Sequence, residues 1–309
     1  MIQIPKSLRF LLLAAASATL LAACGGSDDD SFDDRADIAQ PKVRFVHAVA
    51  GGPNVTLQRN SANESGVTDV AYKYASQYYD VSTENYTFTL RTSSGGAELT
   101  SATVNADRGN KYTLVALPTV SGAELLPIRD PYNKSLTSDD ARVRVLNAAA
   151  NAGPFDVYIT AAGADLATAT PRMTALGYKQ VQPTSGNDSV EIAPGTYRVR
   201  LTPAGSKTPF FDATVTAPAD ADWLLVALPD QATPNSVRLL LVRSDDSSDA
   251  TDEITSTPPG ASTRRNSASI GACASRCSMV SNETMRSTLA SGNGNATTDA
   301  ATKHRFGRA

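Results

Sequence analysis

The chain has little of the chemistry that enzymes and metal sites use. Its 309 residues include three cysteines, two histidines and one tryptophan, and the net charge is only -3. Zinc needs three or four ligands drawn from histidine, cysteine or carboxylates, and nucleic-acid binding needs a surplus of basic residues. The sequence also lacks a glycine-rich phosphate loop and a paired-carboxylate motif. We therefore predict no catalytic residue, no metal, no cofactor and no nucleic-acid partner.

A long hydrophobic run is also missing. The apolar run at the N-terminus, residues 10–23, is shorter than the about 20 residues that a membrane helix needs. Lys6 and Arg9 precede this run, and charged residues follow it closely. A basic region followed by a short apolar region is typical of a secretory signal. We therefore expect residues 1–23 to be a signal peptide.

The end of this segment carries a more specific pattern. Leu21, Ala22, Ala23 and Cys24 resemble the lipobox of bacterial lipoproteins. The resemblance implies cleavage before Cys24, a diacylglycerol on its thiol and an acyl chain such as palmitate on the new amine. Several acyl chains make membrane attachment effectively permanent. Because no aspartate stands at the second mature position, the resemblance favours the outer membrane, in either leaflet, with Cys24 as the lipidation site.

An acidic segment follows the predicted anchor. Residues 28–37 contain six aspartates against the single basic residue Arg35. A block of like charge with low hydrophobicity remains solvated. We expect residues 24–39 to form a flexible tether between the membrane and the folded part.

The folded part reads as two copies of one unit. Residues 43–57, VRFVHAVAGGPNVTL, return as VRVLNAAANAGPFDVYI at residues 143–159. Further along, YTLVALP at residues 112–118 returns as WLLVALP at residues 223–229. Matching blocks in the same order at stable spacing indicate a duplication. We predict one repeat over residues 40–130 and a second over residues 141–244, joined by a short polar link.

Within each repeat the hydrophobic period is two. Tyr86, Phe88 and Leu90 alternate with polar residues, as half-buried strands require. About seven short strands in about 100 residues predict an antiparallel β-sandwich of the immunoglobulin-like kind. The fold class is therefore all-β, with two tandem sandwiches.

One strand in each repeat departs from this alternation. YTLVAL and WLLVAL are apolar on both faces of the strand. Either this strand is central and covered on both sides, or its outer face is where the two copies pack against each other. The first interpretation is favoured.

These residues resemble a bacterial family of unknown activity. The Val-Arg openings at residues 43 and 143, the Asp156-Val157-Tyr158 strand and the Pro-Gly-Thr-Tyr turn before residue 198 are similar to the domain of unknown function 4397 family. His47 matches the histidine of the family pattern, whereas the second copy has Asn147. In the first copy Asn54 stands near the aspartate position, and Glu84 with Asn85 replaces the turn pair. The resemblance implies immunoglobulin-like, often tandem and lipid-anchored modules, without an established activity.

Two groups of polar residues in the repeats could contact a ligand. His47 is interpreted as a turn stabiliser at the end of a strand, with ligand contact as the alternative, since its counterpart Asn147 can make the same backbone hydrogen bonds. Arg198 and Arg200, with Lys207 nearby, could hold a sugar acid or phosphate. Their favoured interpretation is the solvated face of an outer strand.

The C-terminal segment changes in character. Residues 245–309 are rich in serine, threonine, asparagine, glycine and proline, and we expect them to be disordered. Cys273 and Cys277 could form a local disulfide or half of a metal site, although exposed thiols are favoured. A reading-frame change after Arg265 is a further hypothesis.

The sequence as a whole predicts a non-enzymatic, lipid-anchored protein of the cell envelope. Its first predicted function is to bind an envelope glycan or protein, and the alternative is a structural spacer or assembly subunit. A hydrolase is the least favoured of the three. Because sandwiches carry function on their loops, we expect a ligand at loops such as residues 58–67 and 202–208.

Overall fold

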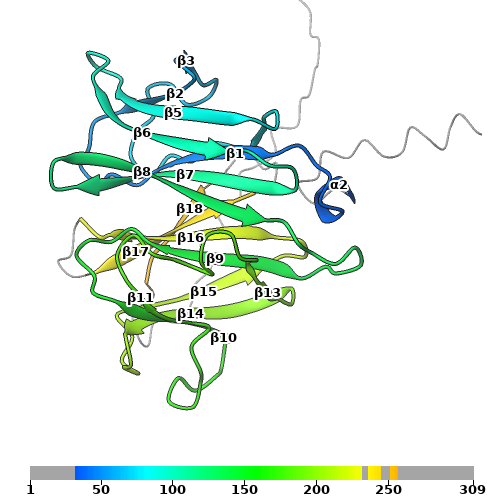
Figure 1. The fold of residues 1–309 in the computed structure, drawn as a ribbon. Helices are drawn as coiled ribbons and strands as arrows, with labels where there is room; N and C mark the ends of the chain where they lie inside the picture. Colours follow the sequence, from blue (N-terminus) through cyan, green and yellow to red (C-terminus); the bar gives the residue numbers. More distant parts are fainter. Residues whose placement is uncertain (1–31, 232–235, 245–250, 257–309) are drawn as a thin grey trace, which may run out of the picture. The chain divides into compact units, whose positions relative to one another are not determined.

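The protein is described by a computed structural model over residues 32–231, 236–244 and 251–256. Within these ranges the regular structure is β-strand, apart from the four-residue helix α2 (Phe32–Arg35). In β5 (Asn85–Thr92), Tyr86, Phe88 and Leu90 are buried, so the expected alternation produces a strand with one face in the core. The all-β prediction is confirmed (Figure 1).

The first sandwich consists of two four-stranded sheets. Sheet A has the order β4-β1-β7-β8 and sheet B the order β3-β2-β5-β6. The remaining strands are β1 (Lys42–His47), β2 (Val55–Arg59), β3 (Ala62–Asn63), β4 (Tyr79–Asp80), β6 (Glu98–Asn105), β7 (Asn110–Thr119) and β8 (Gly122–Pro131). Phe45, Leu57, Phe88 and Leu114 meet between the sheets and are fully buried.

The second sandwich repeats this plan. Sheet C has the order β12-β9-β16-β17-β18, with β13 also paired to β9, and sheet D has the order β11-β10-β14-β15. The strands are β9 (Ala141–Asn147), β10 (Phe155–Ala161), β11 (Met173–Leu176), β12 (Val181–Gln182), β13 (Val190–Ile192), β14 (Gly195–Pro203), β15 (Phe211–Ala217), β16 (Asp222–Pro229), β17 (Val237–Arg243) and β18 (Thr251–Ile254).

The two sandwiches share their strand register as well as their strand order. Val43 of β1 pairs with Tyr112 of β7, and Val143 of β9 pairs with Trp223 of β16. Both of these pairings are parallel, whereas the sequence predicted an antiparallel sandwich. Alternation of apolar residues has the same period in both kinds of pairing, so it could not distinguish them. The expected sandwich of two packed sheets is otherwise present. Proteins with this architecture share the two packed sheets but do not always share the strand connections.

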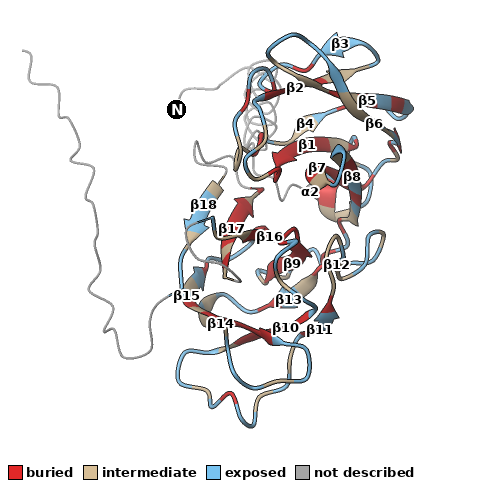
Figure 2. Ribbon diagram, turned by 90° about the vertical axis from the view of Figure 1, so that its left-hand side faces the viewer, coloured by how far each residue is buried: buried red, intermediate tan, exposed pale blue. Residues whose placement is uncertain are grey.

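The apolar outer faces of sheets A and C pack against each other. Val46, Val115 and Ile128 of the first sandwich form one buried cluster with Leu224 and Val226 of the second. Figure 2 shows buried residues along β1, β9 and β17. The favoured interpretation of YTLVAL and WLLVAL was therefore incomplete. Both strands are central in their sheets, but the outer face of each is covered by the other sandwich. We call this contact the sandwich interface.

Charged residues continue the sandwich interface. Lys111 Nζ lies 3.3 Å from Asp222 Oδ2, and Arg142 Nη2 donates to Asp130 Oδ1 at 2.9 Å. The ring of Tyr132 contacts both cations, with its centroid 4.2 Å from Lys111 Nζ and 4.4 Å from Arg142 Cζ. We call these five residues the interface ion cluster. Burial alone would raise the pKa of Asp222, but the charges of Lys111 and Arg142 lower it.

Both ends of the folded part extend further than the sequence predicted. Residues 24–39 were expected to be a flexible tether, yet Asp34 is buried and pairs with Lys42, while Arg35 donates to Asp220 at 2.9 Å. A Cβ at Gly109, where φ is +69°, would clash with the side chain of Asp37. Asp34 and Arg35 form ion pairs with residues of the folded part. The acidic composition of this segment therefore did not prevent residues 32–39 from packing against the fold.

The predicted C-terminal boundary also lies too early. The sequence placed the start of a disordered tail at residue 245, but β18 pairs with β17 from residue 251 to 254. Glu253 of β18 accepts hydrogen bonds from Arg238 of β17 at 2.9 Å and from Lys73 of the first sandwich at 2.7 Å. β18 therefore bridges the two sandwiches.

Candidate functional site

His47 lies at the end of β1 and is fully buried. Its Nδ1 accepts the amide of Val49 at 3.2 Å, so Nε2 carries the proton and donates to the carbonyl of Pro53 at 3.1 Å. Asn147 takes the same place in the second sandwich, where its Oδ1 accepts the amide of Ala149 at 3.0 Å. Burial lowers the pKa of His47, which keeps the ring neutral. This geometry agrees with the interpretation of His47 as a turn stabiliser.

The arginines of β14 were expected to form a solvated face, and this is wrong for Arg200. Arg200 is only 4% exposed and donates to the hydroxyl of Thr160 and the carbonyl of Ala164. Arg198 forms a two-pronged ion pair with Asp212, with both distances 2.6 Å. The segment after β10 folds over this face of sheet D, a contact between residues distant in sequence that alternation cannot reveal. Neither guanidinium is therefore available as an open anion site.

Other predicted site residues lie outside the described ranges or away from any cluster of ligands. Cys24, Cys273 and Cys277 are outside the described residues. Within the described part of the chain, no group of three histidine, cysteine or carboxylate side chains is placed to hold a metal ion. The same part contains no helix with the length and apolarity needed to cross a bilayer.

The two loops expected to meet a ligand lie in different sandwiches. Residues 202–208 join β14 to β15, and Lys207 there is held over the ring of Tyr158 at 4.7 Å. Residues 58–67 include β3 and form one wall of an open groove at the end of the first sandwich. Of the two loops, residues 58–67 thus contribute to a concave site.

The groove has a volume of about 1040 Å³. One wall is formed by residues 59–65, around the turn from β2 to β3. The other wall is formed by residues of the segment 79–86, from β4 to the start of β5. Pairing of β2 with β5 joins part of the two walls within sheet B, whereas β4 belongs to sheet A, so the groove is lined by residues of both sheets. We call this feature the β2–β4 groove.

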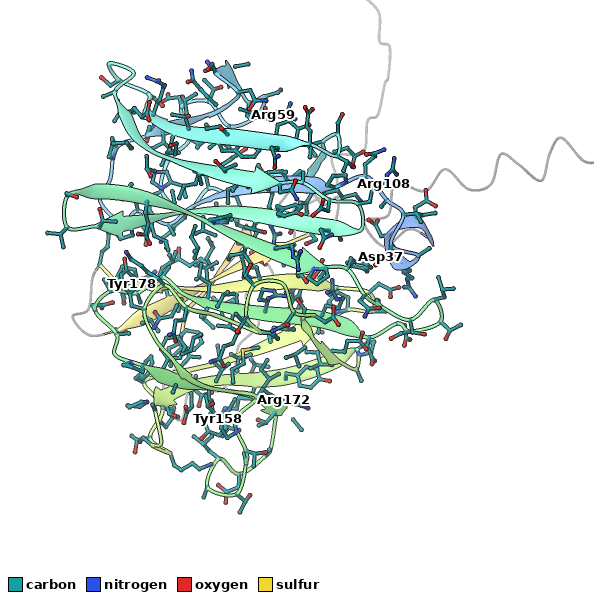
Figure 3. All side chains as sticks on the ribbon, in the orientation of Figure 1. Asp37, Arg59, Arg108, Tyr158, Arg172 and Tyr178 are labelled. Carbon is teal, nitrogen blue, oxygen red and sulfur yellow. The ribbon has the colours of Figure 1, made fainter. Side chains whose placement is uncertain are left out.

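Arg59, labelled in Figure 3, lines the β2–β4 groove and makes several contacts with other lining residues. Its Nε lies 2.8 Å from Oε1 of Glu64, whose side chain is almost fully buried. Its guanidinium carbon lies 5.8 Å from the ring centroid of Tyr79 and 5.3 Å from that of Tyr86. Both distances are within the range of cation–aromatic attraction. Arg59 is thus held in place by an ion pair and two rings, with 31% of its side chain still exposed.

The hydroxyls of the two tyrosines remain protonated at neutral pH, because the pKa of each is raised. Burial and the neighbouring Glu64 raise the pKa of Tyr79. Burial and the hydrogen bond to Glu84 raise the pKa of Tyr86, whose hydroxyl donates to Glu84 Oε1 at 2.8 Å. Tyr86 is only 5% exposed and the hydroxyl of Tyr79 is buried, so the two rings mainly support Arg59 from behind the surface of the groove.

The second sandwich has the same frame without the groove chemistry. Arg59 pairs with Phe88, and at the equivalent place Ile159 pairs with Val199. Ile159 is 5% exposed and belongs to the core of the second sandwich. Arg59 therefore occupies a position that faces the core, where the other copy places an apolar side chain.

The aromatic wall differs between the copies in the same way. Tyr79 pairs with Val43, whereas its counterpart Val190 pairs with Val143. Tyr86 has a counterpart of its own kind, because Tyr197 also donates to a carbonyl four residues earlier. Arg59 and Tyr79 thus distinguish the first sandwich from the second.

Sequence reasoning found one wall of this site but not the other. Residues 58–67 were selected as a loop, and Arg59 falls among them. Tyr86 was assigned to a half-buried strand and Tyr79 was not singled out, because alternation does not show which strand end borders a groove. Aligning the two copies position by position would have indicated Arg59, because it aligns with Ile159. A cation at that position departs from the apolar core pattern that the two copies share.

Comparison with known proteins supports the family resemblance over part of the chain. Residues 41–158 match the family model described as Domain of unknown function (DUF4397). This range covers the first sandwich and continues to Tyr158 in β10 of the second. The resemblance noted from the Val-Arg opening is confirmed for these residues. None of the curated proteins matches the chain.

One solved structure with a detectable likeness is a carbohydrate-binding module. It is described as the crystal structure of CBMbc, of family CBM26, from Eubacterium rectale Amy13K in complex with maltoheptaose. The match has 8% sequence identity and a TM-score of 0.21, and it covers 71% of this chain and 98% of that one. A likeness of this size carries no argument about the function of this chain.

Proposed function

We propose that the chain is a non-enzymatic binding protein of the bacterial cell envelope, whose β2–β4 groove holds an envelope glycan or protein. The observation that carries this proposal is the difference between two sandwiches of one design. Replacing a core-facing apolar residue by Arg59 costs burial energy, because polar groups are buried favourably only when they are paired. In the first sandwich Glu64, Tyr79 and Tyr86 supply that pairing, and of the two tyrosines only Tyr86 has a tyrosine counterpart in the second. Such a local departure from the core pattern is expected at a functional site.

A membrane anchor completes the proposal. Lipidation of Cys24 would hold the protein at the outer membrane, and the short segment from residue 24 to α2 would keep the groove close to the bilayer. The support for this part is the lipobox-like order of residues before Cys24. Mass spectrometry of the mature N-terminus tests it. We expect acylated Cys24, and an unmodified cysteine with residues 1–23 still attached would contradict the anchor.

Binding is tested with variants that give the first sandwich the residues of the second. Arg59→Ile and Tyr79→Val introduce side chains that the same frame already accepts at Ile159 and Val190. We expect capture of an envelope glycan on an array, or of an envelope protein in a pull-down, to be lost in the double variant. Val120→Ala is the control, because Val120 is fully exposed and outside the groove. Equal binding by the double variant and the native chain would reject the groove.

The sandwich interface favours a second candidate function, that of a structural spacer. Its buried apolar cluster and the interface ion cluster join both sandwiches into a single compact unit. Deletion of the gene, followed by complementation, separates the two functions. If the Arg59→Ile and Tyr79→Val double variant restores envelope integrity as well as the native chain does, the spacer function is supported. If it fails to restore integrity while folding normally, the binding function is supported.

A further inference from the structure

We infer that the β2–β4 groove selects an uncharged, hydroxyl-rich glycan and that Asp80 and Glu84 exclude acidic glycans from it. This inference rests on the proposed binding function and names the class of ligand. Four side chains of the groove carry charge, namely Arg59, Glu64, Asp80 and Glu84. One cation against three carboxylates leaves the groove with a formal charge of -2.

Arg59 does not form an open site for an anion. Its Nε is engaged by Glu64 at 2.8 Å, so an almost fully buried carboxylate already balances its charge. The rings of Tyr79 and Tyr86 hold the guanidinium from the side. A ligand carboxylate approaching the exposed edge of Arg59 would also meet Asp80 and Glu84. Like charges in such a site oppose binding, and the more so as water is excluded.

The amide groups of the first wall are oriented as donors. The Oδ1 atom of Asn60 accepts the backbone amide of Thr87 at 3.0 Å. The Oδ1 atom of Asn63 accepts from Gln58 Nε2 at 2.9 Å, and Gln58 is itself fixed by a hydrogen bond from Arg91. These bonds define which amide atom is oxygen and which is nitrogen. In both asparagines the amide nitrogen has no partner in the described part of the chain and is available to a ligand.

The opposite wall offers acceptors. Asp80 is exposed, and its carboxylate makes no side-chain hydrogen bond or ion pair within the described ranges. One oxygen of Glu84 accepts from Tyr86, which leaves the other oxygen for a ligand. The groove is therefore lined by donors from one wall and acceptors from the other, together with Arg59, whose side chain is 31% exposed.

Hydroxyl groups fit this arrangement better than charged groups. A sugar hydroxyl both donates and accepts, so neighbouring hydroxyls can use both walls at once. A carboxylate or phosphate only accepts and would leave the acceptors of the second wall unmatched. An ammonium group only donates and would leave the amide nitrogens of Asn60 and Asn63 unmatched. A neutral glycan is the class that matches the whole groove.

The test uses the full-length lipidated protein in detergent micelles on a glycan array with matched sets of neutral, acidic and amine-bearing oligosaccharides. We expect neutral glycans to be bound and their acidic counterparts to be bound at least about tenfold more weakly, the size of one like-charge contact. Asp80→Asn and Glu84→Gln keep the shape of each side chain and remove its charge. In the double variant we expect the affinity for acidic glycans to rise about tenfold and the affinity for neutral glycans to change by less than about threefold.

Three results would overturn the inference. The first is binding of acidic glycans by the native chain as tight as that of neutral ones, and the second is binding of amine-bearing glycans alone. Absence of any glycan binding also overturns it, but the proposed function then stands if a protein partner is captured and lost in the Arg59→Ile and Tyr79→Val variant. If neither a glycan nor a protein depends on the groove, the proposed function fails as well.

Discussion

At the scale of single residues, His47 and Asn147 show how one backbone requirement is met by two side chains. Each accepts the amide of the residue two positions later, and each lies at the end of the first strand of its sandwich. The sequence predicted this role because asparagine and histidine can make the same local hydrogen bonds. Their difference lies in titration, since only the histidine can become charged.

This difference predicts a pH dependence. Burial lowers the pKa of His47 from 6.5, so the unfolded chain binds a proton there at a higher pH than the folded protein does. The free energy of unfolding should therefore be constant above pH 6.5 and fall as the pH drops below it. We expect His47→Asn to remove this fall, at a cost of about 1 to 2 kcal/mol at pH 7.5 from lost ring contacts.

Urea denaturation of both proteins between pH 7.5 and pH 5 provides the measurement. The carboxylates are shared by the two proteins, so the difference between the two curves isolates His47. A parallel decline of stability in His47→Asn and the native chain would contradict the assignment.

Asp222 is the residue on which the interface ion cluster depends. Its pKa is lowered despite burial, because Lys111 and Arg142 are close to it. A lowered carboxyl pKa contributes stability above the ordinary pKa, which is lost as the pH falls through the folded value. Removing this charge at neutral pH takes away the carboxylate that Lys111 and Arg142 share, while Asp130 still pairs with Arg142.

We expect Asp222→Asn to reduce the free energy of unfolding by about 3 to 5 kcal/mol, the range for breaking a buried ion pair. Chemical denaturation at pH 7 measures the change. Asp80→Asn is the matched control, because Asp80 is exposed and should change stability by less than about 0.5 kcal/mol. Similar values for the two variants would show that the ion cluster is not stabilising.

At the scale of elements, the strands with one buried face were predictable and the contacts between distant elements were not. β5 shows its period-two alternation in the sequence, and the structure has the same buried residues. β18 and α2 were missed because their sequences are polar, and they are held by ion pairs to residues far along the chain. The burial of Arg200 was missed for a related reason, since the covering segment comes from outside its strand.

The sequences of β7 and β16 are apolar on both faces, but only the structure shows what covers the outer face. A strand that is apolar on both faces must be covered twice, but the sequence does not say by what. The structure shows that each covers the other's sheet. The duplication itself could have suggested this, because two copies with the same exposed apolar strand have matching surfaces.

The sandwich interface predicts the effect of a truncation in its centre. Leu224 of β16 is 2% exposed and packs in the shared cluster rather than in the core of its own sandwich. We expect Leu224→Ala to reduce the free energy of unfolding by about 2 to 5 kcal/mol through the cavity it leaves. Val120→Ala, at a fully exposed position, should have almost no effect. An equally small effect at Leu224 would mean that the interface does not contribute to stability.

At the scale of the whole molecule, the interface makes separate unfolding of the sandwiches unfavourable. Unfolding either one would expose the apolar outer face of the other and separate the charges of the ion cluster. We therefore expect one cooperative transition for the described unit. Differential scanning calorimetry should give a calorimetric enthalpy equal to the van't Hoff enthalpy. Two resolved transitions would contradict coupling through the interface.

Duplication also shows why the proposed binding site is assigned to one sandwich. The two sandwiches have the same strand register, so the same core-facing positions can be apolar in both. The fold therefore does not require the two copies to differ at such a position. Arg59 and Tyr79 are such differences, and both border the β2–β4 groove. The second sandwich therefore acts as an internal control for the first.

The most direct test of this account is hydrogen exchange of the full-length protein with and without the envelope ligand that it captures. Ligand should slow exchange at residues 59–65 and 79–86, which form the walls of the groove, and leave the equivalent parts of the second sandwich, β10 and β13, unchanged. Slower exchange in the second sandwich alone, or at residues 202–208 instead of the groove, would contradict the account.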